Sequence, residues 1–169
     1  MAKPVEGEFN PYAGTYINYV PEDDVVTALA ANTRIMIDFF RSIPVDKRDY
    51  AYAPGKWTIK QVLQHVTDAE RIFAYRALRF ARADKTELPG WEENEYGEQA
   101  RVDHLQWDDM LDEFIVVRKS SEYLFKSLNE AELQRGGIAN GRFNTVNSIG
   151  FVIAGHAYHH HKITQERYL

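Results

Sequence analysis

Histidine is concentrated near the C-terminal end of this 169-residue chain, where the sequence reads "GHAYHHHKITQERYL". Imidazole nitrogens are common metal ligands, so this cluster could be one half of a metal site. It could also be the remnant of an affinity tag or the polar end of a core helix. Two other residues interrupt the cluster, and eight more continue the helical pattern after it, which argues against a tag. Four of the six histidines lie here: His156, His159, His160 and His161.

Helical geometry separates these four histidines by direction. At about 100° per residue, His156 and His160 lie within about 20° of Ile149, which belongs to an apolar stripe. His159 lies at one edge of that stripe, about 80° away, and His161 points elsewhere. The i, i+4 spacing lets one helix offer two nitrogens to one ion. We therefore expect His156 and His160 to face the protein interior together.

A third histidine could join them from another helix. His65 lies in "KQVLQHVTDAER" at the edge of an apolar stripe, so it should face a neighbouring helix. Buried imidazoles without a partner would cost about 1–3 kcal/mol each. The partner could be a carboxylate or a tyrosine on a facing helix, or a metal ion. Three imidazoles around one ion would leave an open coordination position, as in reactive metal sites.

Such a site suggests two kinds of reaction. At its open position, the ion would lower the pKa of water from ~15.7 towards ~7, which favours hydrolysis. It could instead capture a thiolate, which would allow small-thiol S-transfer without a cysteine in the protein. No general base, such as the glutamate of an HExxH motif, lies beside the histidines. A metal-stabilised bundle that acts as a sensor or an interaction module therefore stays open as an alternative.

Other polar residues have weaker claims to a function. Glu70 could orient a ligand imidazole through its second nitrogen, or it could form a salt bridge with Arg71 or Arg118. His104 is expected to be solvated. A run of acidic residues is expected to form a wet loop surface: Glu92, Glu93, Glu95 and Glu98.

Periodicity predicts four amphipathic helices that would position these residues. The first begins at Pro21, carries acidic residues in its first turn and is stopped by Pro44. The second begins after Thr58, which has capping-box spacing with Gln61, and it continues to about Ala83.

The third helix opens at "VDHLQW", where Asp103 and Gln106 again have capping-box spacing, and the fourth follows Asn144 or Thr145. Four such helices without a convincing set of strands indicate an all-α four-helix bundle. The connection from about 84 to 102 is long for a compact bundle, and loops of this length are usually functional or disordered. It could form a lid, with Tyr or Trp side chains that line a substrate pocket.

The segment "GGIANGRFN" before the fourth helix predicts a small hairpin, because Asn-Gly is typical of a two-residue turn. The chain shows no internal repeat and no domain boundary. We therefore expect one domain over residues 1–169, with residues 1–20 as an N-terminal extension.

Composition argues against several classes of protein. The formal charge is −5 and no Lys/Arg-rich block occurs, so nucleic acid is not an expected partner. No apolar run approaches the roughly 20 residues that cross a bilayer. The start "MAKPVEGEFNP" lacks the apolar stretch of a signal peptide, which favours a cytoplasmic protein. Cysteine is absent, which removes disulfides and cysteine ligands.

Two segments resemble motifs of the DinB-like (YfiT-like) metal-binding superfamily. "KWTIKQVLQHVTDAER" is similar to its Trp-Ser/Thr-x-x-[QE]-x-x-x-His-x-x-Asp-x-Glu signature. "NTVNSIGFVIAGHAYHHHKITQERYL" is similar to its final helix, which contains a Gly-His-x-x-x-His segment. "LPGWEENEY" and "GGIANGRFNTV" also resemble its intervening segments, so the likeness covers most of the chain, from about Pro21 to Leu169.

This resemblance implies a four-helix bundle, commonly a homodimer, with a divalent metal held by His65, His156 and His160. Zinc or nickel is the expected metal, with iron, cobalt or manganese as the alternatives. No role is implied for His159 or His161. Members of the superfamily resemble thiol S-transferases, thiol-dependent isomerases or metal-dependent hydrolases. We therefore expect a small-molecule substrate, with a low-molecular-weight thiol as one candidate.

Overall fold

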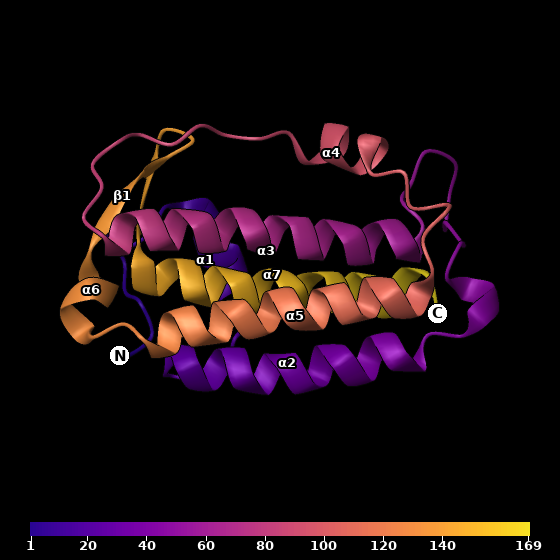
Figure 1. Cartoon of the computed structure of the whole chain (residues 1–169), viewed down its shortest axis with the longest axis horizontal. Coiled ribbons are helices and arrows are strands. Elements are labelled where there is room, and N and C mark those ends of the chain that lie inside the picture. The colour runs from indigo at the N-terminus through magenta and orange to yellow at the C-terminus, as the bar shows by residue number, and fades with distance from the viewer.

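The computed structural model describes all 169 residues, and most of them are helical (Figure 1). Four long helices form a bundle in which α3 packs on α7 and α5, and α2 packs on the same two helices. The all-α four-helix bundle expected from the sequence is confirmed. None of the helices is long and apolar enough to cross a membrane. The long helices are α2 (Val25–Ser42), α3 (Ile59–Ala81), α5 (Trp107–Lys126) and α7 (Val146–Arg167).

Shorter elements connect and flank the bundle. Two of them form the predicted antiparallel hairpin, whose turn residues Asn140 and Gly141 have φ angles of 52° and 67°. Two short helices, α1 and α4, lie where the sequence predicted only an extension and a loop. The shorter elements are α1 (Pro11–Ile17), a 3-10 helix (Val45–Lys47), α4 (Glu93–Gln99), α6 (Glu130–Gln134), β1 (Gly136–Ala139) and β2 (Arg142–Thr145).

The connection between α3 and α5 is long because these two helices run in the same direction. Both begin at the end of the bundle where the C-terminus lies, so the chain must return along the whole bundle after α3 (Figure 1). The helix α4 lies within this return, and Leu88 forms a parallel bridge with Ala139 of β1. The long loop expected at 84–102 is therefore a crossover that contains its own helix.

Side-chain caps fix the starts of α3 and α7 as the sequence predicted. Thr58 and Gln61 form the expected capping box, in which each side chain bonds to the other residue's backbone N–H. The side chain of Thr145 caps α7 by accepting from the backbone N–H of Ser148. The predicted stop of α2 is also confirmed, because that helix ends just before Pro44.

Two predicted helix starts are wrong. The helix α2 begins at Val25 rather than Pro21, because Asp24 is its N-cap and also binds the N-terminal ammonium group. The helix α5 begins at Trp107 with no side-chain cap. Residues 103–105 form a turn closed by the backbone bond from Leu105 to the buried Val102, so the capping box predicted there does not form.

The apolar core is divided into two clusters. One contains side chains such as Leu29, Phe125 and Ile153, and the other contains side chains such as Met36 and Phe114. Each of the four long helices contributes to both clusters. Buried polar side chains lie between the two clusters along the sequence of each long helix: Asn32, Glu70, Arg118 and His156.

The short helix α1 packs against α7 at a glycine. A Cβ atom on Gly155 would overlap the backbone carbonyl of Tyr16. Because Gly155 has no Cβ, the two helix backbones can touch at this point. This contact brings Tyr16 to the residue that follows Gly155, which is His156.

Candidate metal centre

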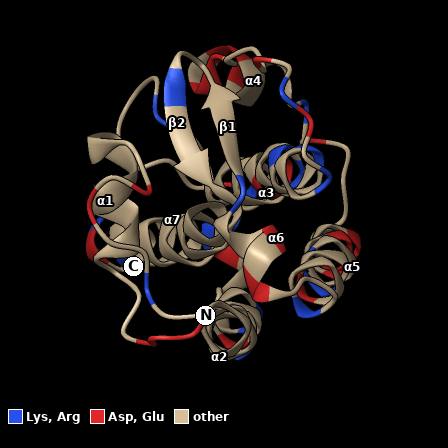
Figure 2. Ribbon diagram, turned by 90° about the vertical axis from the view of Figure 1, so that its left-hand side faces the viewer, with Lys and Arg blue, Asp and Glu red and all other residues tan.

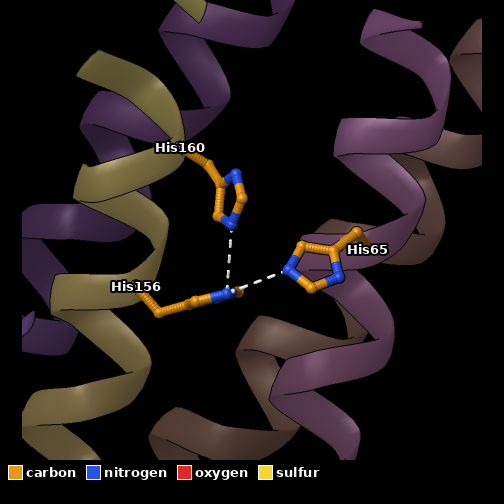
Figure 3. A group of neighbouring side chains, drawn as sticks. All are labelled: His65, His156 and His160. Atoms are coloured by element: carbon orange, nitrogen blue, oxygen red, sulfur yellow. Dashed lines mark hydrogen bonds between the residues drawn. The ribbon is translucent and has the colours of Figure 1, made fainter. Parts of the chain in front are cut away.

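Three imidazole rings meet between α3 and α7 (Figure 3). His65 comes from α3, whereas His156 and His160 come from successive turns of α7. The Nε2 atom of His156 lies 3.0 Å from Nε2 of His65 and 3.2 Å from Nε2 of His160. A ligand nitrogen from each ring lies within 4.8 Å of the other two. The structure therefore brings together the three histidines that the sequence analysis selected.

Burial favours the neutral form of these rings. Desolvation lowers the pKa of His65 to about 4, and it lowers the pKa values of His156 and His160 well below the usual value of histidine. The proximity of other histidines lowers all three pKa values further. At neutral pH the cluster consists of uncharged imidazoles, which is the form that binds metals.

The donor set fits a divalent metal ion. Nε2 of His156 has two nitrogen neighbours, but a neutral imidazole nitrogen carries either one proton or one lone pair. It can therefore satisfy only one of them by a hydrogen bond, whereas a cation could accept a lone pair from all three rings. Nitrogens bound to one zinc ion at about 2.0–2.1 Å and near-tetrahedral angles are about 3.3 Å apart, close to the two separations above. The Nδ1 atom of His65 is buried without a partner, so only Nε2 of this ring has polar contacts.

Two tryptophans cover His65. The ring of Trp57 lies 4.6 Å from that of His65, measured between centroids, and Trp91 of the crossover stacks at 5.8 Å. The crossover is held here by a hydrogen bond from Gln61 Nε2 to the carbonyl of Gly97, 3.2 Å long. Aromatic side chains thus exclude water from this side of the cluster, which strengthens electrostatic interactions within it.

Two further aromatic rings contact His156. Tyr16 of α1 and Phe73 of α3 meet it edge to face, with ring centroids 5.4 Å and 5.7 Å away. The hydroxyl of Tyr16 lies 3.0 Å from that of Tyr12. Burial and the bond to Tyr12 raise the pKa of Tyr16, and the charge of Glu93 acts in the same direction. The sequence analysis missed Tyr16 because no local pattern marks the N-terminal extension as part of the site.

Glu70 does not contact an imidazole. Both carboxylate oxygens accept from Nε of Arg118 at 2.9 Å, and both side chains are almost fully buried. Arg118 also donates to the side chain of Asn32, which donates in turn to the carbonyl of Ala154 on α7. Of the alternatives considered for Glu70, the salt bridge with Arg118 is the one that forms.

The other histidines lie outside the cluster. The ring of His159 packs against Tyr16 and Tyr19, and that of His161 packs against Phe39. His104 is exposed, as predicted. The acidic run is also exposed as predicted: Glu92, Glu93, Glu95 and Glu98.

A pocket of about 300 Å³ reaches the cluster at His156. Trp91 of the crossover lines its wall together with Glu92 and Glu93, and the lid over a substrate pocket expected from the sequence stays a prediction. Side chains of α1, α3, the hairpin and α7 complete the lining. Figure 2 shows these elements gathered around the same side of the bundle.

Comparisons with known proteins agree with this geometry. A family model described as the DinB superfamily matches residues 28–163. Among solved structures, YfiT from Bacillus subtilis superimposes with a TM-score of 0.69 and 16% sequence identity, covering 97% of this chain and 92% of that chain. The structure of YfiT is described as an unusual four-helix bundle topology. A search of curated proteins finds no match.

Proposed function

This chain belongs to the DinB superfamily, and from this premise we propose that it is a metal-dependent hydrolase that acts on a small molecule. YfiT, which shares the fold, is described as a probable metal-dependent hydrolase. The family and the fold support a metal site, and the pocket supports a reaction at that site. The homodimer and the cytoplasmic location expected from the sequence stay predictions.

In this proposal, Nε2 atoms of His65, His156 and His160 hold one divalent ion, with zinc or nickel as the proposed metal and iron, cobalt or manganese as alternatives. A divalent ion bound by three neutral ligands is a strong Lewis acid that can activate water near neutral pH. The chain keeps its ligand nitrogens neutral by burying them, and it orients His65 by packing Trp57 and Trp91 against it.

The observation that carries the proposal is the pocket that reaches His156. A sensor or interaction module would need no cavity at this ring, whereas an enzyme needs room for a substrate beside the metal. A volume of about 300 Å³ lies at the lower end of the range of small-molecule sites. The geometry therefore favours an enzyme over a metal-stabilised module.

Residues of the pocket offer the remaining groups that hydrolysis requires. The carboxylates of Glu92 and Glu93 line the wall and can accept the proton that an attacking water loses. The hydroxyl of Tyr16, which also lines the pocket, can donate a hydrogen bond. These groups supply the general base that the sequence analysis did not find beside the histidines.

The ligand assignment is tested by elemental analysis of untagged protein purified without added metal. We expect about one metal ion per chain in the wild type, and loss of stoichiometric metal in His65→Ala, His156→Ala and His160→Ala. The exposed His104→Ala is the matched control and should keep its metal. Retention of stoichiometric metal in all three cluster variants would refute the assignment.

The reaction is tested on a panel of esters and amides, with metal-replete and chelated protein, in the presence and absence of a small thiol. Turnover without thiol that disappears on chelation supports the hydrolase. Turnover only with thiol would replace hydrolysis by S-transfer. If neither reaction occurs and chelation mainly lowers stability, the metal has a structural role and the enzyme proposal fails.

A further inference from the structure

Two arginines line the pocket without a carboxylate partner. Arg76 of α3 is half-buried, and its side-chain hydrogen bond goes to the backbone carbonyl of Pro89 at 2.8 Å. Arg142 begins β2 and lies over the ring of Tyr12, 5.6 Å from its centroid. Neither guanidinium forms an ion pair within the chain, although eight other pairs join basic and acidic side chains.

The other two arginines of α3 have carboxylate partners, whereas Arg76 does not. Arg71 bonds to Glu113 at 2.7 Å, and Arg79 pairs with Asp84. Arg76 lies between them on the same helix but faces the pocket instead of a carboxylate. A half-buried guanidinium is only weakly hydrated, so an incoming anion can form a charge-assisted, two-pronged hydrogen bond with it at little desolvation cost.

The pocket has an apolar stretch between Arg76 and the metal centre. Phe73, whose ring contacts His156, lies one turn before Arg76 on α3. Val152 and Ile149 line the facing wall at one and two turns before His156 on α7. Seven residues of helix separate Ile149 from His156, which corresponds to about 10 Å along the pocket.

Charge differs between the walls of the pocket. Acidic residues gather on α4, whereas β2 carries a basic segment (Figure 2). Glu92 and Glu93 line the pocket, and so do Arg76 and Arg142. The two arginines would attract a carboxylate to their part of the pocket, whereas Glu92 and Glu93 would repel it from theirs.

We propose that Arg76, with Arg142 beside the same cavity, binds a carboxylate of the substrate and so directs a distant ester or amide bond towards His156. The substrate class is thus a small carboxylic acid with an apolar part and a cleavable ester or amide bond. Water adds across that bond and releases an acid together with an amine or alcohol, while the anchoring carboxylate is unchanged. This inference rests on the proposed function, because it names the substrate class of the same pocket.

Binding of two probes that differ by one charge tests this assignment. N-acetylglycine carries a carboxylate, and N-acetylglycinamide is its neutral counterpart of the same shape. Titration of the metal-replete protein, followed by NMR, should show about tenfold tighter binding of the acid, the size expected for one charge-assisted hydrogen bond. Arg76→Gln should abolish this preference, Arg76→Lys should keep part of it, and Arg71→Gln, which removes a charge outside the pocket, should keep all of it.

A carboxylate could also bind a metal directly, so the same titration is made with His65→Ala. If His65→Ala no longer binds the acid more tightly than the amide but Arg76→Gln still does, the carboxylate binds the metal and the proposed role of Arg76 is wrong. If His65→Ala keeps the preference for the acid and Arg76→Gln loses it, Arg76 binds the carboxylate, even if no hydrolysis is ever found. Equal binding of both probes by the wild type, or tighter binding of methyl phosphate than of the acid, would also overturn the proposal.

Discussion

At the scale of single residues, the surroundings of each histidine decide what it can do. His156 and His161 are five positions apart on one helix, but only His156 faces another imidazole. The direction of each side chain follows from helical geometry, and it could be read from the sequence. The burial that keeps the cluster neutral depends on Trp57, Trp91 and Tyr16, which come from other parts of the chain.

The neutral cluster makes the stability of the metal-free protein depend on pH. Burial lowers the pKa values of these histidines in the folded state, to about 4 for His65, whereas the unfolded chain has a value near 6.5. Between these values the unfolded state binds more protons, so the free energy of unfolding falls as the pH falls from about 6.5 towards 4. Each histidine that is neutral in the folded state but protonated in the unfolded state adds up to about 1.4 kcal/mol per pH unit to the slope of the free energy of unfolding. Above pH 7 the contribution of each histidine is constant.

Urea unfolding of chelated protein at pH 8, 6.5 and 5 measures this dependence. The variant His65→Gln has no titrating group at this position, so its slope below pH 6.5 should be smaller than that of the wild type. The exposed His104→Gln should keep the wild-type slope. Equal slopes in the wild type and in His65→Gln would show that His65 is not held neutral by burial.

At the scale of elements, the site depends on the contact between α1 and α7. Because a Cβ at position 155 would overlap the backbone of Tyr16, Gly155→Ala must push α1 away from α7. We expect this overpacking to cost about 1–3 kcal/mol of stability, although alanine is the better helix former by about 1 kcal/mol. Displacement of Tyr16 should also lower activity, because this side chain lines the pocket.

Thermal unfolding and turnover of Gly155→Ala measure the two effects. Metal content should change little, because α3 and α7 alone supply the three imidazoles. A variant as stable and as active as the wild type would mean that α1 does not pack on α7 at this glycine.

The sequence predicted those elements whose signals are local. The capping box at Thr58 and Gln61 formed as expected, and so did the hairpin at Asn140-Gly141, because each motif satisfies its own backbone groups. The same spacing at Asp103 and Gln106 was misleading. At this place the chain turns between Val102 and Leu105 instead, because tertiary contacts bury the side chain of Val102.

Elements whose stability comes from tertiary contacts were missed. The helices α1 and α4 have seven residues each, too few for a periodic pattern to be distinguished from a loop. They form against Gly155 and Trp57, which lie far away in the sequence. The histidine cluster could be selected because it depends on two long helices, whereas the pocket could not, because five separate segments line it.

At the scale of the whole molecule, a polar layer formed by Asn32, Glu70 and Arg118 joins all four long helices. It links α2, α3 and α5 directly, and Asn32 extends it to the carbonyl of Ala154 on α7. Its three side chains lie between the two apolar clusters along α2, α3 and α5. A sliding motion of any long helix would separate these partners, so the layer fixes the register that places His65 opposite His156.

The polar layer predicts a strong coupling between its charged residues. Arg118→Met would leave the carboxylate of Glu70 buried without its counter-charge, because both side chains are at most 2% exposed. We expect this single change to cost about 3–5 kcal/mol of stability. The double variant Glu70→Leu, Arg118→Met removes both charges and should be clearly more stable than the single one, so the two effects are non-additive. Denaturant unfolding of the wild type, both single variants and the double variant measures the coupling energy. Strict additivity would show that the pair is not coupled.

The same double variant tests whether the polar layer sets the register of the helices. It lacks the contacts of the layer but keeps every imidazole, so it should bind metal more weakly than the wild type. Unchanged metal affinity would mean that the apolar clusters alone set the register.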